Sequence, residues 1–118
     1  MRTPLALTAL VFAAIADVSS GTATHHVVNT RDASIAIRTF QFSPDTLRVK
    51  SGTRVVWTNA DEIEHTITSG TPAEPDNRFG GVVDKRGAAY AATLEKPGTY
   101  AYFCDRHRFM HGTVIVTR

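Results

Sequence analysis

Short alternating runs separated by turn residues constrain this chain more than any other feature of its sequence. From Ser34 onward apolar and polar residues alternate, and no segment sustains a helical period. Alternation at a period of two is typical of strands that bury one face. About seven such runs with turn signals between them predict an all-β fold, either a sandwich or a barrel. The runs cover residues 35–40, 47–50, 54–59, 65–69, 88–94, 99–103 and 112–117.

Two connecting segments carry expectations of their own. Ser51-Gly52-Thr53 separates two runs closely enough to predict a hairpin. Residues 70–87 contain repeated glycine and proline, so we expect the longest irregular segment of the chain there. Its expected anchors in the core are Phe79, Val82 and Val83.

Length, charge and cysteine content narrow the class of protein. The chain has 118 residues, 42% of them apolar, which suits one small folded domain. A formal net charge of +2, without a block of lysine and arginine, argues against nucleic-acid binding. The single cysteine, Cys104, excludes an internal disulfide.

The amino-terminal segment has the features of a signal peptide. Met1-Arg2 is basic, Leu5–Ala16 is apolar and uncharged, and Ala14-Ile15-Ala16 has the small-x-small form that signal peptidase cleaves. The apolar run is shorter than the about 20 residues that span a bilayer, which disfavours an uncleaved anchor. We therefore expect a signal peptide over residues 1–16, with cleavage as late as residue 24, and a periplasmic or otherwise exported protein.

Residues 17–33 are small and polar, and we expect them to form a flexible leader before a folded domain at residues 34–118. His25 and His26 lie in this leader and are interpreted as a solvated pair. The alternative is a metal site: cleavage after Ala23 would leave a histidine at the third position of the new terminus, an arrangement that binds Cu(II) through nitrogen.

The segment around Cys104 carries the chemistry. His107 follows Cys104 by three positions, and Met110 follows His107 by three. Thiolate, imidazole and thioether are three of the four groups of a blue-copper electron-transfer site, and the fourth is a second histidine. His65, which starts a β-run 39 positions before Cys104, is the candidate for the fourth. The alternative is a buried free cysteine beside surface residues.

Strand alternation also predicts how Cys104 is presented. Tyr100, Tyr102 and Cys104 share one face of their run, and we expect this face in the core with Phe103 partly outside. The sulfur would then lie at the inner end of a strand, directly before a short loop that can bend three side chains toward one point.

These motifs resemble those of the small blue-copper cupredoxins, the family of plastocyanin, pseudoazurin and amicyanin. The short Cys-x-x-His-x-x-Met loop is most similar to that of amicyanin. The matching segments lie within residues 35–118 and comprise Val56–Asn59, His65–Thr68, Pro97–Tyr100, Tyr102–Cys104, His107, Met110 and Gly112–Val116.

The resemblance implies a Greek-key β-sandwich of about eight strands that holds one copper ion. His65, Cys104 and His107 would form a trigonal plane around copper, with Met110 as the weak axial ligand. His65 would be buried between the sheets, and His107 would reach the surface with one ring edge. Tyr100 would be a buried corner tyrosine.

The loop departs from the amicyanin pattern at positions that bear on docking. Arg106 and Arg108 flank His107, where amicyanin-type members usually have prolines. We interpret both arginines, together with Phe109, as a surface that surrounds the electron exit and attracts a redox partner with an acidic face. The alternative is two ordinary solvated arginines.

Other residues near the motif carry smaller expectations. Thr66 stands where plastocyanin and amicyanin often have asparagine, and its hydroxyl is a candidate to replace the asparagine's hydrogen bond across the site. His111 is expected to point away from the metal, and Asp105 to cap the turn through its carboxylate. The acidic loop before His65 is interpreted as solvated and comprises Asp61, Glu62 and Glu64.

The sequence therefore predicts an exported, monomeric type 1 copper protein that shuttles single electrons between redox proteins by cycling between Cu(II) and Cu(I). A copper-binding protein for storage, delivery or resistance would use the same ligands and is the alternative. An enzyme is not expected. One cysteine excludes a thiolate-bridged binuclear centre, five histidines are too few for a multicopper oxidase, and Cys104 and His107 are badly placed for a cysteine hydrolase. The methionine argues against structural zinc.

Overall fold

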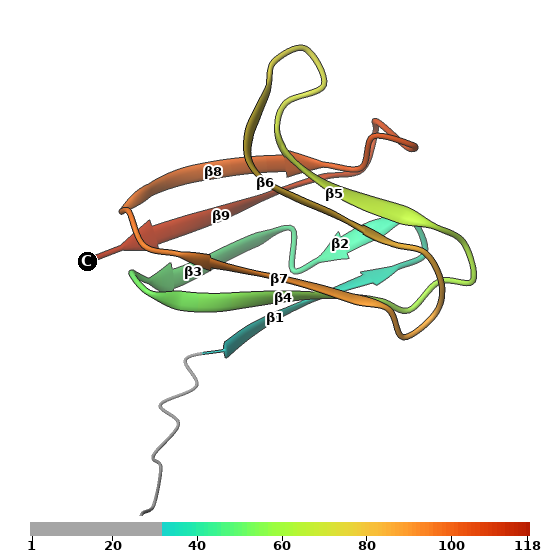
Figure 1. Ribbon diagram of the computed structural model, residues 1–118, viewed down its shortest axis with the longest axis horizontal. Coiled ribbons are helices and arrows are strands. Elements are labelled where there is room, and N and C mark those ends of the chain that lie inside the picture. The colour runs from blue at the N-terminus through green and yellow to red at the C-terminus, as the bar shows by residue number, and fades with distance from the viewer. Residues whose placement is uncertain (1–31) are drawn as a thin grey trace, which may run out of the picture.

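The computed structural model describes residues 32–118 (Figure 1). The expected signal peptide, the leader up to residue 31 and the pair His25 and His26 lie outside the described residues. The described part contains nine strands: β1 (Asp32–Arg38), β2 (Gln41–Ser43), β3 (Thr46–Lys50), β4 (Thr53–Asn59), β5 (His65–Gly70), β6 (Pro75–Val83), β7 (Ala89–Leu94), β8 (Gly98–Phe103) and β9 (His111–Thr117).

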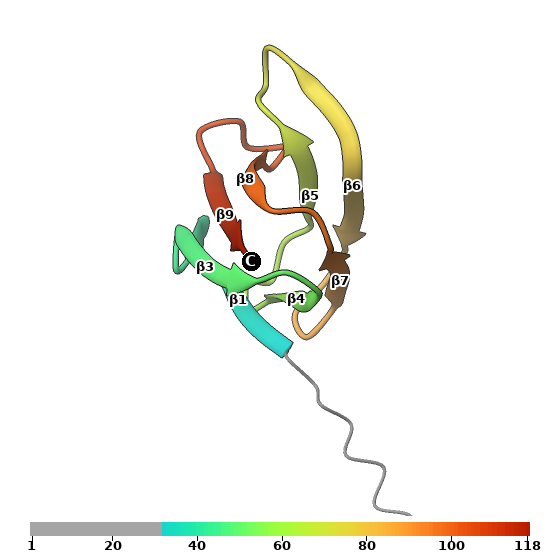
Figure 2. The same cartoon turned by 90° about the vertical axis from the view of Figure 1, so that its left-hand side faces the viewer.

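The strands form two sheets that pack as a sandwich (Figure 2). One sheet has the order β2-β1-β4-β7, and the other has the order β3-β9-β8-β5-β6. Both sheets are mixed, because β1 runs parallel to β4 and β3 runs parallel to β9, whereas the other neighbours are antiparallel. The expected all-β sandwich is confirmed, with one strand more than the about eight expected.

The core lies between the sheets and follows the alternation of the sequence. In β4, Val55 and Trp57 are buried, whereas Arg54 and Thr58 are exposed. Burial of aromatic and β-branched side chains is the main force that closes such a sandwich. The core residues with the least exposure are Ile35, Ile37, Val55, Trp57, Ile67, Val83, Tyr102, Cys104 and Val114.

The prediction of a hairpin across Ser51-Gly52-Thr53 is wrong. β3 pairs with β9 in one sheet, and β4 pairs with β1 and β7 in the other, so this turn carries the chain between the sheets. The turn is bonded to both sheets: Ser51 N–H donates to Thr117 C=O at 2.7 Å, and Gly52 N–H donates to Leu94 C=O at 2.8 Å. A short turn fits either connection, and the strands that decide between them come from distant parts of the sequence.

Residues 70–87 are also more regular than expected, because β6 occupies Pro75–Val83 at the edge of its sheet. β6 forms an antiparallel ladder with β5 that begins at the pair His65 and Val83. Proline is compatible with the first residue of an edge strand, since no neighbouring strand needs its missing N–H.

The glycines of β6 serve packing and do not break the strand. A side chain on Gly81 would collide with the Tyr90 ring, which lies against the glycine backbone. Of the three expected anchors, Val83 is buried and Phe79 packs partly buried against the core, but Val82 is 60% exposed. Val82 and Val83 are adjacent in a strand, so only one of them can face inward.

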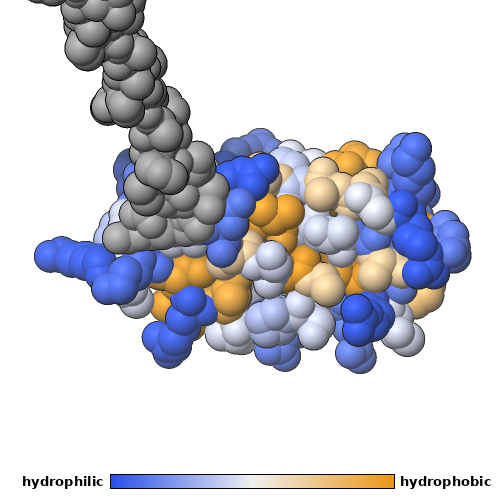
Figure 3. Space-filling model, turned by 90° about the horizontal axis from the view of Figure 1, so that it is seen from below, coloured by the Kyte–Doolittle hydropathy of each residue, from blue (hydrophilic) through white to orange (hydrophobic). Residues whose placement is uncertain are grey.

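One end of the sandwich, at the right of Figure 1, gathers the segments that matter for function. The β1–β2 turn, the start of β5 and the loop between β8 and β9 all lie at this end. Elsewhere the surface is mixed: Figure 3 shows a face on which hydrophilic residues interrupt smaller hydrophobic areas. Among residues 32–118, no helix has the length and apolar character needed to cross a membrane.

Candidate metal centre

The loop between β8 and β9 is folded into two successive turns. His107 N–H donates to Cys104 C=O at 3.3 Å, and Met110 N–H donates to His107 C=O at 2.8 Å. Cys104 N–H closes the loop by donating to Met110 C=O at 3.0 Å. The spacing Cys-x-x-His-x-x-Met thus places each of the three side chains at a boundary of a turn.

Three donor atoms converge at this end of the sandwich. Cys104 Sγ lies 3.8 Å from His65 Nδ1 and 3.6 Å from His107 Nδ1. All three donors lie within 4.8 Å of one another. Metal bonds of about 2.0–2.3 Å in a trigonal plane separate their donor atoms by about 3.5–3.8 Å. The observed spacing therefore fits one first-row metal ion between the three donors.

The candidate ligands are shielded from water to different degrees. Cys104 and His65 are completely buried, and Met110 is 2% exposed. His107 is only partly buried, so one imidazole reaches the surface, as expected. A thiolate, a thioether and two imidazoles, largely closed to water, suit both Cu(I) and Cu(II).

Asn59 orders the loop that presents His65. Its buried side chain donates to the carbonyl groups of Ile63 at 2.8 Å and Val83 at 3.0 Å, and it accepts Asp61 N–H at 2.9 Å. Val83 is also the residue that pairs with His65 across β5 and β6. The loop and the sheet therefore fix His65 at the first position of β5 together.

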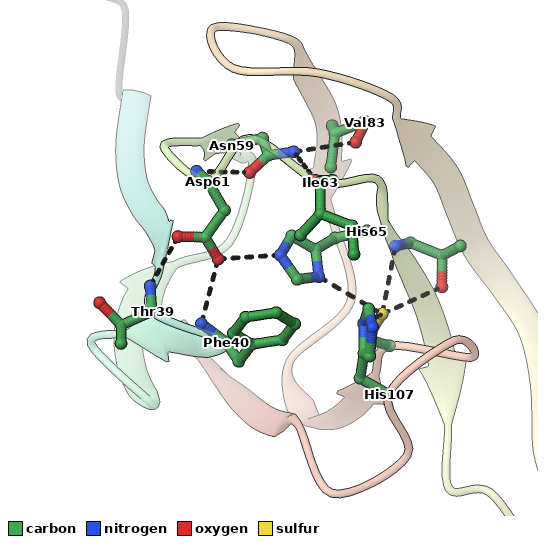
Figure 4. Close-up of polar contacts among 10 residues, drawn as sticks. Thr39, Phe40, Asn59, Asp61, Ile63, His65, Val83 and His107 are labelled. Atoms are coloured by element: carbon green, nitrogen blue, oxygen red, sulfur yellow. Dashed lines mark hydrogen bonds and ion pairs between the residues drawn. The ribbon is translucent and has the colours of Figure 1, made fainter.

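Asp61 sets the orientation of the His65 ring (Figure 4). Asp61 Oδ2 lies 2.9 Å from His65 Nε2, and the same carboxylate accepts Thr39 N–H at 2.7 Å and Phe40 N–H at 3.0 Å. When Nε2–H donates to the carboxylate, Nδ1 keeps its lone pair for a metal. Burial alone would raise the pKa of Asp61, but these three partners outweigh it and hold the pKa below its ordinary value. The interpretation of Asp61 as solvated is therefore wrong.

Thr66 joins β5 to the Cys104 loop. Its backbone N–H donates to Cys104 Sγ at 3.4 Å, and its hydroxyl oxygen lies 4.0 Å from the same sulfur. The hydroxyl accepts Asp105 N–H at 2.8 Å. A threonine hydroxyl therefore makes the bond across the site for which it was the candidate on sequence grounds.

β8 is buried on both faces where it approaches the site. Tyr100, Tyr102 and Cys104 belong to the core, as expected, and the Tyr100 hydroxyl donates to Lys96 C=O at 2.5 Å. Phe103, expected partly outside, is only 1% exposed. It lies on the outer face, beside a depression lined also by the β5–β6 turn and Arg108. Segments from elsewhere in the chain thus cover a face that alternation assigns to solvent.

The rim of the site combines paired charges with exposed apolar side chains. Arg106 forms an ion pair with Glu64, and Arg108 Nη2 lies 3.3 Å from Asp105 Oδ1. The Asp105 carboxylate thus pairs with an arginine and does not cap the turn. His111 is exposed and does not belong to the group of potential metal ligands found in residues 32–118. The exposed large apolar residues of this end are Phe40, Ile63 and Phe109.

Two residues at the site are not found by sequence reasoning. Alternation assigns Phe40 to a strand, whereas it lies in the β1–β2 turn with its ring against both imidazoles. Asp61 has one usable signal, an acid four positions before a candidate ligand histidine, since such histidines usually bond a carboxylate through their second nitrogen. Phe40 has no local signal, because its contacts are all to residues distant in sequence.

This sandwich and this ligand set define the class of protein: a cupredoxin with a type 1 copper site of His65, Cys104, His107 and Met110. The chain belongs to the plastocyanin/azurin family of copper-binding proteins, whose family model matches residues 29–117.

Individual relatives support the same placement. Amicyanin-alpha of Methylorubrum extorquens is 33% identical over 84 residues, which cover 70% of this chain and 69% of the relative. Amicyanin of Paracoccus versutus is 30% identical over 82 residues, and the match spans 70% of this chain but only 62% of that relative. Plastocyanin of Scenedesmus fuscus is 32% identical over 84 residues, covering 64% of this chain and 85% of the relative.

Solved structures agree with these relatives. A purple cupredoxin from Nitrosopumilus maritimus superposes with a TM-score of 0.68 at 29% identity, covering 73% of this chain and 100% of the other. An oxidised amicyanin variant superposes with a TM-score of 0.63 at 30% identity, covering 71% of this chain and 80% of the other.

Proposed function

We propose that the chain is a monomeric single-electron carrier that passes electrons between redox proteins and performs no catalytic turnover of its own. The observation that carries this proposal is the burial of the site: His65, Cys104 and Met110 are enclosed, and His107 alone reaches the surface. A metal enclosed in this way has no room for a substrate. Enclosed ligands also favour retention of copper over its delivery to an acceptor.

In this proposal each residue has a distinct role. His65 Nδ1, Cys104 Sγ and His107 Nδ1 would hold the copper ion, and the Met110 thioether would be a weaker fourth ligand. The bound copper supplies a reversible one-electron step between Cu(II) and Cu(I). The protein supplies rigidity, since Thr66 bonds the ligand loop to β5 and limits how far the donors move between the two states.

The visible spectrum of the copper-loaded protein tests the site. We expect strong thiolate-to-copper absorption, lost in Cys104→Ala because the sulfur donates the charge that is transferred. His111→Ala is the control and should keep the absorption, because His111 is exposed outside the cluster. A colourless copper adduct of the unaltered protein would refute the proposal.

We place the docking surface at the rim around His107, comprising Arg106, Arg108 and Phe109. The arginines favour a partner with an acidic face, and Phe109, 69% exposed, adds apolar area that a partner can bury. Glu64 and Asp105 each pair with one arginine, so the electrostatic attraction is weaker than two free arginines would give.

Charged redox reagents test the arginines. Electron transfer from the Cu(I) protein to hexacyanoferrate(III), an anion, should slow with added salt and slow further in Arg106→Glu/Arg108→Glu. The matched control is Lys50→Glu/Lys96→Glu, which makes the same charge change on exposed residues at the opposite end of the sandwich. Glu64→Gln/Asp105→Asn should act in the other direction and speed the reaction. Equal rates in the two double glutamate variants would rule out local steering.

We also propose that the protein is exported, with a signal peptide removed between residues 16 and 24 and the copper domain at residues 34–118. The support is the basic start, the apolar run and the small-residue site. Intact mass measured on protein from the periplasmic fraction is the test. A mature chain that still begins at Met1 would contradict the proposal.

A further inference from the structure

The turn between β1 and β2 has a backbone conformation that its residues do not favour. Arg38 pairs with Gln41, so Thr39 and Phe40 form a two-residue hairpin loop. Both have positive φ, 53° for Thr39 and 56° for Phe40. Two-residue loops with positive φ at both residues normally contain Asn-Gly, Asp-Gly or Gly-Gly. A β-branched residue followed by an aromatic one in the left-handed region is strained, and such strain persists only where the surroundings impose it.

Asp61 imposes this conformation. Its carboxylate accepts the N–H groups of both turn residues, Thr39 at Oδ1 and Phe40 at Oδ2. The same Oδ2 lies 2.9 Å from His65 Nε2. One side chain that is only 14% exposed therefore ties the strained turn to a copper ligand. Charge-assisted hydrogen bonds of this kind are roughly twice as strong as neutral ones, which suits a group that must offset strain.

The turn places the Phe40 ring against both ligand imidazoles (Figure 4). The ring centroid of Phe40 lies 5.4 Å from that of His65 at an interplanar angle of 86°, and 5.0 Å from that of His107 at 89°. These are favourable edge-to-face distances. Phe109, the other aromatic residue of the rim, contacts His107 alone, at 6.2 Å. In residues 32–118 Phe40 is therefore the one aromatic side chain that packs against both ligands.

We propose that the Thr39-Phe40 turn is a clamp on the copper ligands, in which Asp61 holds the strained backbone and Phe40 is a positioning residue for His107. The inference rests on the proposed copper site. His107 needs such support because it lies on a short loop and is only partly buried, whereas His65 is enclosed and bonded to Asp61. A ring packed at a right angle to His107 opposes its rotation away from the metal.

The rate of copper release measures how strongly the clamp holds the ligands in place. A Cu(I)-selective chelator, bathocuproine disulfonate, is added in excess to the Cu(I) protein, and the rate of copper transfer is followed. Phe40→Ala should release copper about ten-fold faster, the loss expected for two edge-to-face contacts. Phe40→Leu keeps apolar volume without a ring and should fall between. Thr39→Asn relaxes the turn and keeps the ring, so its release rate should stay within about two-fold of the unaltered protein.

Phe40→Gly distinguishes an effect on copper release from an effect on the stability of the fold. Glycine suits positive φ, so the copper-free variant should unfold at the same or a higher urea concentration, yet it should release copper faster. Unaltered release rates in Phe40→Gly and Phe40→Ala would overturn the proposal. Equal acceleration in Thr39→Asn would overturn it too, because the ring is present there.

A double-mutant cycle tests the role of Asp61. Asp61→Asn should lower the urea midpoint of the copper-free protein more when the turn has its native sequence than in a Thr39→Asn/Phe40→Gly background. The substituted turn residues adopt positive φ readily and do not need the Asp61 carboxylate to hold them there. Loss of the His65 bond is common to both backgrounds and cancels. Equal losses in the two backgrounds would contradict the clamp.

A readout without copper keeps the clamp distinguishable from the proposed function. Carbon relaxation of the His107 imidazole in the copper-free protein should show a lower order parameter in Phe40→Ala than in the unaltered protein. An unaltered protein that gives no thiolate-to-copper band would refute the copper function, and this measurement would still decide the clamp. Equal order parameters would overturn the clamp and leave the copper function standing.

Discussion

At the scale of single residues, Thr66 connects the start of β5 to the Cys104 loop. It follows His65 directly, and its N–H donates to Cys104 Sγ. Its hydroxyl lies 4.0 Å from the same sulfur and accepts Asp105 N–H. Hydrogen bonds to a thiolate draw charge from it and tune the metal that it binds. The hydroxyl therefore has two effects, one on the stability of the loop and one on the electronic properties of the sulfur.

Thr66→Val isolates the hydroxyl, because valine keeps the shape of the side chain and the backbone N–H. Asp105 N–H would lose its acceptor, so we expect a loss of about 1 kcal/mol in the free energy of unfolding of the copper-free protein. Urea titration measures this loss, and the thiolate-to-copper band should shift in the loaded protein. Thr66→Ser keeps the hydroxyl and is the control. A valine variant that matches the serine variant in both measurements would show that the hydroxyl has neither effect.

At the scale of elements, the ligand loop takes its shape from the pairing of β8 and β9. Phe103 pairs with His111 and Tyr102 pairs with Gly112, so the loop of residues 104–110 is closed by a regular ladder. Gly112 is required at this position, because a Cβ would overlap the phenol of Tyr102, which lies across the strand pair. The absence of one side chain thus allows a large ring beside the loop.

Gly112→Ala should destabilise the copper-free protein by about 1–3 kcal/mol, the usual cost of forcing extra volume into a packed site. Urea unfolding measures the loss. In a Tyr102→Leu background the added methyl group no longer meets a phenol, so the same substitution should cost less. An equal cost in both backgrounds would mean that the Tyr102 ring is not the cause.

At the scale of the whole molecule, an aromatic cluster connects the two sheets beneath the site. Trp57 of β4 packs at right angles to Tyr102 of β8, with ring centroids 5.4 Å apart. Phe79 and Tyr90 pack against Trp57 from β6 and β7. Neither Trp57 Nε1 nor the Tyr102 hydroxyl makes a hydrogen bond. The cluster therefore stabilises the sandwich through packing, and its polar atoms add little.

The buried Tyr102 hydroxyl predicts a loss of stability at alkaline pH. Burial raises the pKa of Tyr102 to about 12 from its ordinary 10.0, and the Asp45 carboxylate adds to the rise. Between these values the unfolded chain loses the tyrosine proton more readily than the folded protein, so the free energy of unfolding falls as pH rises.

Tyr102→Phe removes this titration. We expect the free energy of unfolding of the copper-free variant, measured in urea at pH 8 and at pH 11, to fall by less than that of the unaltered protein. Near neutral pH the variant should be close to the unaltered protein, because the hydroxyl has no hydrogen-bond partner to lose. Parallel losses at alkaline pH would assign the effect to other groups.

Much of the architecture follows from the sequence. The alternation in β4 and the inward set of Tyr100, Tyr102 and Cys104 agree with the structure, because period-two patterns report directly which side chains share a face. Which strands pair with one another does not follow from the sequence. The turn at Ser51-Gly52-Thr53 allows a hairpin or a passage between sheets, and the backbone bonds to Leu94 and Thr117 belong to strands far along the chain.

The sequence by itself determined the chemistry of this protein: the four ligand residues of three types, the spacing of three between Cys104, His107 and Met110, and a β-rich chain to carry them. These features are local, and local spacing is sufficient to specify turns and strand faces. Only the tertiary structure decided which residues support the ligands. Asp61 contacts both His65 and the strained Thr39-Phe40 turn because the two sheets bring these segments together at one end of the sandwich. No local sequence pattern encodes how the two sheets pack against each other.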